Sequence, residues 1–195
     1  MQPKRQRAIS AFPYNDSDEV LMSSFFLIVL AIASRILPHS WLNFTAVGGS
    51  LVYFGARRPL RESVVPLVLL AMTDYYLTVY VYNYAFHVQG YLLTWVWYVA
   101  AIVLGSLLLR DKVSAGRVAA ATVLSATSFF ALSNYAVWAN AGMYPHNFAG
   151  LTACFMAALP FYRNDLLSTG LVLGMAFGLP ALLRRFSEAQ QKAAA

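Results

Sequence analysis

Charged side chains and cysteine are both scarce in this sequence. Only 11% of its 195 residues are charged, whereas 59% are hydrophobic. So few charges cannot cover a soluble globule of this size, and much of the surface is therefore expected to face lipid. The single cysteine, Cys154, excludes an internal disulfide and cannot supply a cysteine pair to a metal. We expect one domain embedded in a membrane.

The sequence lacks the residues that several functions of membrane proteins require. The lysines, Lys4, Lys112 and Lys192, lie outside the predicted helices, which excludes a retinal Schiff base. The histidines fall in predicted loops, so a pair of axial ligands for a buried haem is lacking and no cofactor is expected. The sequence contains no Walker-type glycine loop and no HExxH or GxSxG motif. We predict neither an ATPase nor any other enzyme, and no metal site.

The apolar segments predict an all-α fold, a six-helix transmembrane bundle. About 20 helical residues cross a hydrocarbon core of ~30 Å. The predicted helices cover residues 21–37, 43–56, 63–82, 91–109, 117–138 and 166–183. The second is short and rich in small residues, so we expect it to pack inside the bundle or to cross only partly. Pro160 and the polar residues after it are predicted to divide the last apolar stretch, leaving 149–159 as a partly embedded outer segment.

Basic residues gather in alternate gaps between these segments, three in each gap. The positive-inside rule places those gaps and both termini in the cytoplasm. Residues 1–20 and 184–195 are then cytoplasmic tails around a transmembrane domain of residues 21–183. The clusters lie beside apolar segments, so lipid headgroups rather than nucleic acid are the expected partner. The four clusters are Lys4, Arg5 and Arg7; Arg57, Arg58 and Arg61; Arg110, Lys112 and Arg117; and Arg184, Arg185 and Lys192.

Two arginines, Arg35 and Arg163, break this pattern and fall near the outer ends of predicted helices. Arg35 has a possible partner in Asp74, a carboxylate within an apolar helix. An unpaired charge costs several kcal/mol inside a membrane, so such residues pair with each other or line a wet cavity. Two interpretations remain open: an ion pair that joins the first and third helices, or a role for at least one of the two in ligand binding.

Aromatic residues are concentrated in the outward half that this topology defines. An interfacial belt is the simpler interpretation, but a belt normally has two sides, and the cytoplasmic side shows little beyond Tyr53 and Phe54. The asymmetry favours an aromatic cup that opens outward and can stack on a flat ligand. The predicted ligand-binding residues are Arg35, Asn43, Asp74, Tyr76, Asn134, Trp138, Arg163 and Asn164. In this hypothesis the two arginines bind an anionic group, and Asp74 holds an arginine or accepts a hydrogen bond from the ligand.

The last helix carries two further signals. Asn164 or Asp165 could cap its beginning rather than contact a ligand. Gly170, Gly174 and Gly178 recur every four residues and form a stripe on which another helix can pack closely. That helix belongs to this chain or to a partner, and we favour the former.

Five short stretches occur in a recognisable order along the chain. They are Asn43-Phe44-Thr45-Ala46-Val47-Gly48, Pro66-Leu67 through Thr73-Asp74, Ser133-Asn134-Tyr135 through Trp138, Tyr144-Pro145 through Gly150-Leu151, and Leu159-Pro160-Phe161-Tyr162-Arg163-Asn164. With them the chain resembles, over about residues 21–178, a family of uncharacterised bacterial six-helix membrane proteins. That family is itself similar to the substrate-capture (S) subunits of energy-coupling-factor vitamin transporters.

The resemblance implies a subunit of the bacterial inner membrane that captures a vitamin-like molecule from the outer side. Its implied partners are a transmembrane coupling protein and two ATPases, and Asn134, Tyr135, Pro160, Phe161 and Asn164 correspond to regions that line or shape the pocket. The alternative is an accessory subunit of a larger membrane complex, with no ligand of its own. A carrier that works alone has less support, because the paired broken segments of an internal repeat are lacking.

Overall fold

The computed structural model describes residues 16–36, 45–140 and 142–193, and these form helices and no strands. The predicted all-α class is therefore confirmed. Five of the helices are long and apolar enough to cross a membrane. The elements are α1 (Asp16–Ile36), α2 (Val47–Arg57), the short 3-10 helix η1 (Leu60–Ser63), α3 (Val64–Tyr76), the π-helical turn η2 (Leu77–Val81), α4 (Val88–Leu109), α5 (Ala115–Asn140) and α6 (Phe148–Ala193).

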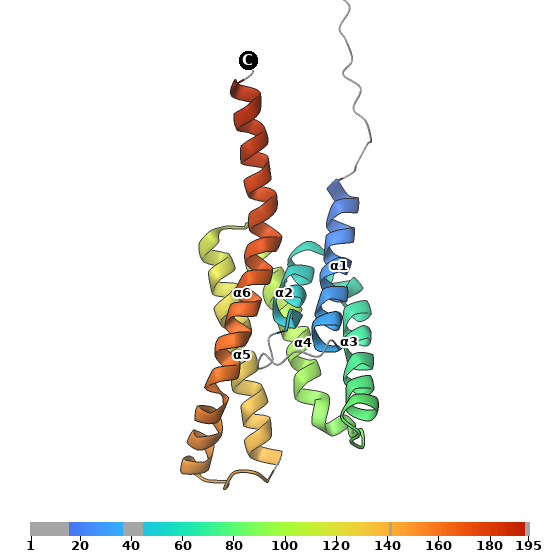
Figure 1. The fold of residues 1–195 in the computed structure, drawn as a ribbon, viewed down its shortest axis with the longest axis vertical. Coiled ribbons are helices and arrows are strands. Elements are labelled where there is room, and N and C mark those ends of the chain that lie inside the picture. Colours follow the sequence, from blue (N-terminus) through green and yellow to red (C-terminus); the bar gives the residue numbers. More distant parts are fainter. Residues whose placement is uncertain (1–15, 37–44, 141, 194–195) are drawn as a thin grey trace, which may run out of the picture.

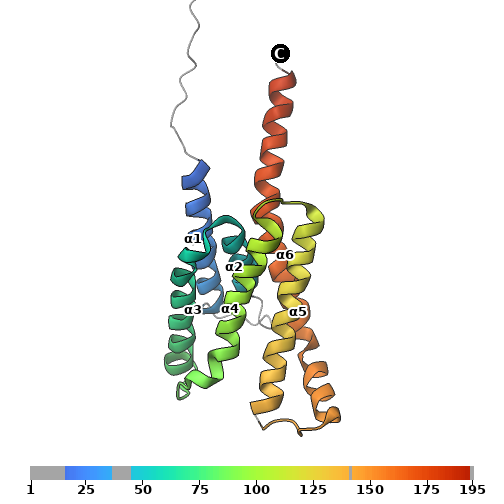
Figure 2. The same ribbon diagram turned by 180° about the vertical axis from the view of Figure 1, so that it is seen from behind.

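Successive helices run in opposite directions (Figures 1 and 2). Helices α1 and α3 form one side of the bundle, α5 and α6 form the other, and α2 and α4 lie between them. The start of α1, the α2–η1 connection, the α4–α5 connection and the end of α6 share one end, the upper one in Figure 1. The described basic clusters therefore lie at a common end, as their alternation along the sequence predicted. That this end faces the cytoplasm stays a prediction.

Helix α2 is the buried centre of the bundle and crosses only half of it. Its 11 residues span about 16 Å at 1.5 Å per residue, roughly half of a hydrocarbon core. Every residue from Ala46 to Ala56 is buried. Glycines make this possible: a Cβ atom at Gly55 would lie 1.8 Å from the Ile102 carbonyl oxygen, and one at Gly105 would lie 1.9 Å from the Val52 carbonyl oxygen. The backbones of α2 and α4 are thus in direct contact, and the prediction of a short internal helix is confirmed.

The predicted division of the last apolar stretch at Pro160 is wrong. Helix α6 runs without a break for 46 residues and contains both Pro160 and Pro180. Proline removes one backbone hydrogen bond, but in a membrane an unwound segment would leave several more backbone groups without partners. Asn164 and Asp165 are consequently mid-helix residues and not caps. At about 69 Å, α6 extends well beyond the other helices at the upper end of Figure 1.

Candidate ligand cavity

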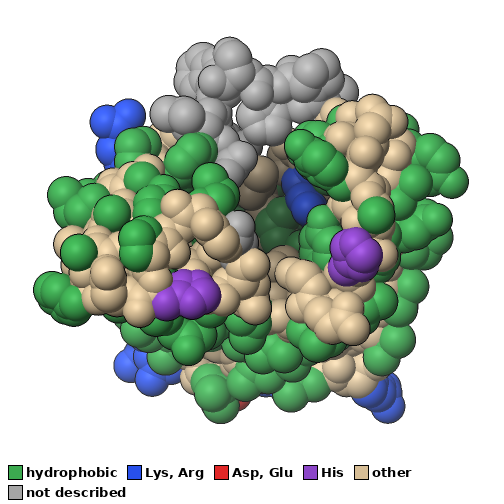
Figure 3. All heavy atoms as spheres, turned by 90° about the horizontal axis from the view of Figure 1, so that it is seen from below, with side chains coloured by type: hydrophobic (Ala, Val, Ile, Leu, Met, Phe, Trp, Pro, Cys, Tyr) green, Lys and Arg blue, Asp and Glu red, His purple; other side chains and the backbone are tan. Residues whose placement is uncertain are grey.

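A cavity of about 320 Å³ lies between the two sides of the bundle, next to the amino-terminal end of α2. Viewed onto the lower end of the bundle, the molecule is hollowed between its helices, and a basic side chain is visible in the hollow (Figure 3). A second hollow of about 450 Å³ adjoins it between α4 and α5. The cavity is lined by Arg35, Thr45, Val47, Gly48, Asp74, Leu77, Tyr82, Tyr91, Thr94, Trp97, Tyr98, Phe129, Phe130, Ser133, Asn134, Phe161, Tyr162 and Asp165.

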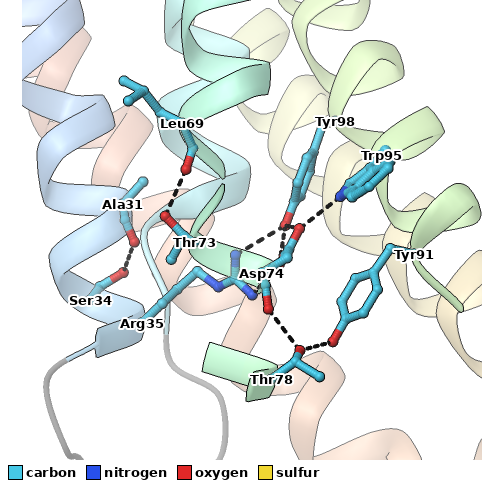
Figure 4. A network of polar contacts seen from close by, with 10 residues as sticks. All are labelled: Ala31, Ser34, Arg35, Leu69, Thr73, Asp74, Thr78, Tyr91, Trp95 and Tyr98. Carbon is cyan, nitrogen blue, oxygen red and sulfur yellow. Dashed lines mark hydrogen bonds and ion pairs between the residues drawn. The ribbon is translucent and has the colours of Figure 1, made fainter. Parts of the chain in front are cut away.

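One wall of the cavity is an ion pair between α1 and α3 (Figure 4). The Arg35 Nη2 atom lies 2.6 Å from Asp74 Oδ1, and the Asp74 side chain is 1% exposed. Trp95 Nε1 donates a hydrogen bond of 2.9 Å to Asp74 Oδ2. The Tyr98 hydroxyl lies 3.3 Å from both carboxylate oxygens and accepts a bond from Arg35 Nη1. Of the two interpretations that the sequence left open, the ion pair of Arg35 with Asp74 is present, and α4 contributes two further donors to it.

Hydrogen bonds continue from this pair to the lower end of α3. Thr78, in η2, donates to the backbone carbonyl of Asp74 at 2.7 Å and is hydrogen-bonded to the Tyr91 hydroxyl (Figure 4). Tyr91 stacks on Phe86 with ring centroids 5.0 Å apart. The π-helical turn and the start of α4 are thereby joined beside the cavity, and the position of Asp74 is fixed from both its side chain and its backbone.

The opposite wall is aromatic and contains a second carboxylate. Phe130 of α5 packs on Tyr162 of α6 with centroids 4.9 Å apart, and Phe129 packs on Trp97 at 4.6 Å. Asp165, one turn after Phe161, is only 9% exposed. Its Oδ2 atom has no hydrogen-bond partner in the described structure. A buried carboxylate oxygen of this kind is costly unless something else satisfies it.

The structure brings three of the predicted binding residues together and separates the others. Arg35, Asp74 and Asn134 all line the cavity. The four predicted residues that lie in the described part but outside the lining are Tyr76, Trp138, Arg163 and Asn164. Asn43 lies outside the described residues. That any of these residues binds a ligand stays a prediction.

The four residues outside the lining have other surroundings. Tyr76 is 45% exposed and packs on the ring of Tyr80. Trp138 Nε1 donates to the carbonyl of Pro145, in the α5–α6 connection. Arg163 is exposed on α6, and Asn164 is half-buried. Because Arg163 is exposed on the surface of the bundle and Arg35 lines the cavity, the two arginines do not converge on one anionic group.

The predicted glycine stripe of α6 is largely open in the described structure. A Cβ atom at Gly170 would meet only the Thr122 Cγ2 atom, at 3.5 Å, and no described atom lies within 4 Å of a Cβ at Gly174 or Gly178. The close helix contacts within this chain instead involve Gly55 and Gly105. The stripe is therefore not a contact between described helices of this chain at Gly174 and Gly178.

The hydrogen bonds of Trp95 and Tyr98 to Asp74, and the place of Asp165 in the cavity wall, are not among the predictions from the sequence. Tyr91, Trp95 and Tyr98 follow one another at helical spacings of four and three, so they share one face of α4. That spacing predicts a row of aromatic side chains with hydroxyl or indole N–H groups that can hydrogen-bond to Asp74. The interruption predicted at Pro160 would make Asp165 a helix cap, whereas the continuous helix turns its side chain into the cavity wall. Among the described residues, no group of three or more His, Cys, Asp or Glu side chains could hold a metal ion.

The helices that could span a membrane, their exposed apolar faces and a cavity with polar groups in its wall together define a multi-pass membrane protein of the helical-bundle class. A family model described as "Family of unknown function (DUF6580)" matches residues 15–192. The chain belongs to this family. Neither the curated proteins nor the solved structures gave a match. The likeness to transporter S subunits accordingly stays a proposal.

Proposed function

We propose that this protein binds a small molecule in the cavity beside α2, as a capture subunit of a membrane transporter. The cavity itself is the observation that carries the proposal. Its volume, about 320 Å³, lies within the range of small-molecule sites, and aromatic side chains with a few polar groups form its walls. If the basic end of the bundle is cytoplasmic, the cavity lies in the outer half and takes its ligand from outside. The proposal includes no catalytic step.

The binding prediction is tested on the purified chain with a panel of vitamins and nucleobases, by thermal stability and titration calorimetry. We expect one compound to stabilise the protein, by about 2.7 kcal/mol at a hundred times its Kd. Thr94→Trp adds a large side chain to the cavity wall and is expected to weaken that binding at least tenfold. Val96→Trp places the same side chain on the exposed face of α4, where Val96 is 60% exposed, and is the matched control.

Two results would count against a binding function. One is that no compound in the panel stabilises the protein. The other is that a compound binds equally well to wild type and to Thr94→Trp, which would place its site elsewhere. A loss of binding in both tryptophan variants would also contradict the proposal, because the control leaves the cavity unchanged.

A second candidate function, an accessory subunit of a larger membrane complex, is favoured by the open glycines of α6. Gly174 and Gly178 are exposed and present a bare stripe on which a helix of another protein could pack closely. Purification in a gentle detergent followed by mass spectrometry is expected to recover such a partner. Gly174→Leu with Gly178→Leu should release it, whereas Ala100→Leu on the exposed face of α4 should not. Recovery of the wild-type chain only as a free monomer would exclude this function.

A further inference from the structure

Among the described residues, three charged side chains line the cavity, and two of them are acidic. They are Arg35, Asp74 and Asp165. Arg35 is paired with Asp74 at 2.6 Å, so its positive charge is already balanced within the wall. We propose that the cavity selects a ligand with a positive charge on or beside a flat ring, such as a protonated or quaternary amine, and that Asp165 is its counter-ion. This inference rests on the proposed binding function and reverses the anionic ligand that the sequence suggested.

Asp165 has the properties of a group that is completed by a ligand. It lies inside α6 with 9% of its surface exposed, its Oδ2 atom has no hydrogen-bond partner in the described structure, and no ion pair to it occurs among the described residues. Asp74, by contrast, receives hydrogen bonds from Arg35, Trp95 and Tyr98. An isolated carboxylate in a membrane helix is costly, and a cationic ligand would remove much of that cost.

Two buried hydroxyl groups without partners lie near this part of α6, one on α6 itself and one on α5. Thr169, one turn further along, and Ser125 of α5 are both buried, and neither hydroxyl oxygen has a hydrogen-bond partner in the described part of the chain. A Cβ atom at Gly48 would lie 2.7 Å from Thr169 Oγ1 and 3.4 Å from Ser125 Oγ, so the glycine leaves room for these oxygens. Polar oxygens without partners therefore cluster where α2, α5 and α6 meet.

The aromatic wall beside Asp165 suits the same ligand chemistry. Phe130, Phe161 and Tyr162 line the cavity together with the carboxylate, and the rings of Phe130 and Tyr162 pack at 4.9 Å. The faces of aromatic rings carry negative potential and attract organic cations, more strongly where water is excluded.

The test compares three probes, each with one aromatic ring, on the full chain in detergent: benzyltrimethylammonium, benzyl alcohol and benzoate. The first keeps its charge at every pH, so differences in affinity do not arise from protonation of the probe. We expect benzyltrimethylammonium to bind at least tenfold more tightly than benzyl alcohol and benzoate not to bind. Asp165→Asn keeps the shape of the side chain and should abolish the preference for the cation. Glu188→Gln makes the same change of charge on the exposed end of α6 and should leave the preference intact.

Different outcomes contradict the inferred ligand class and the proposed binding function. If benzyl alcohol or benzoate binds as tightly as the cation, and Thr94→Trp blocks it, the cavity binds ligands but the inferred class is wrong. If Asp165→Asn retains the preference for the cation, the assignment of Asp165 as the counter-ion is wrong. The inferred ligand class is also wrong if the organic cation does not bind and Na⁺, but not K⁺, stabilises wild type and fails to stabilise Asp165→Asn. Failure of all three probes and of the wider panel overturns the proposed function itself. If Asp165→Asn does not fold, the comparison of probes on wild type decides alone.

Discussion

Replacing Asp74 by alanine is expected to destabilise the protein by about 3–5 kcal/mol, the usual cost of removing one partner from a buried ion pair. The Arg35 guanidinium, with its side chain 19% exposed, would keep its charge but lose the carboxylate at 2.6 Å. Trp95 Nε1 and the Tyr98 hydroxyl would lose their acceptor in the same substitution. Reversible unfolding in mixed detergent micelles, followed by tryptophan fluorescence, measures the change in the free energy of unfolding.

A double variant separates the cost of the lone charge from the value of the pair. Arg35→Met with Asp74→Leu replaces both charged groups by apolar ones of similar size, and it should be more stable than Asp74→Ala alone. The variant Asp74→Asn, which keeps one acceptor oxygen, should fall between wild type and Asp74→Ala. A loss below about 1 kcal/mol in Asp74→Ala would contradict the buried pair, since that is the range of exposed ion pairs.

Much of the bundle could be predicted from composition and charge because those signals are local. Apolar segments of about 20 residues define membrane helices, and alternate basic clusters fix which connections share an end. The pairing of Arg35 with Asp74 was open to prediction for a similar reason: each is a charge in an apolar helix, and few partners exist there.

The continuity of α6 and the composition of the cavity could not be predicted in the same way. Proline usually breaks a helix in water, but its effect at Pro160 depends on what surrounds the helix. Those surroundings cannot be read from the sequence of the helix itself. Which face of α6 is buried decides that Asp165 lines the cavity while Arg163, two residues earlier, is exposed. The contacts of α6 with α2 and α5 determine which face is buried. Because that face carries Asp165 and not Arg163, the inferred ligand is cationic rather than anionic.

Replacing either glycine at the contact of α2 with α4 by alanine is expected to cost about 3 kcal/mol or more. Overpacking a well-packed interior costs about 1–3 kcal/mol when side chains can move. Here the obstacle is backbone: the new methyl group of Gly55→Ala would lie 1.8 Å from the Ile102 carbonyl oxygen, and that of Gly105→Ala 1.9 Å from the Val52 carbonyl oxygen. The two helices would have to separate, and α2, which is buried along its length, would lose contact area with its neighbours.

The same substitution at an open glycine gives the matched control. No described atom lies within 4 Å of a Cβ atom at Gly174, so Gly174→Ala meets no obstacle within the described bundle. It also gains the helix propensity of alanine, worth up to about 1 kcal/mol. Unfolding in mixed micelles should therefore show a large loss of stability for Gly55→Ala and Gly105→Ala and no loss, or a small gain, for Gly174→Ala. Equal effects at the buried and the open positions would contradict direct backbone contact between α2 and α4, on which the placement of the cavity at the end of α2 depends.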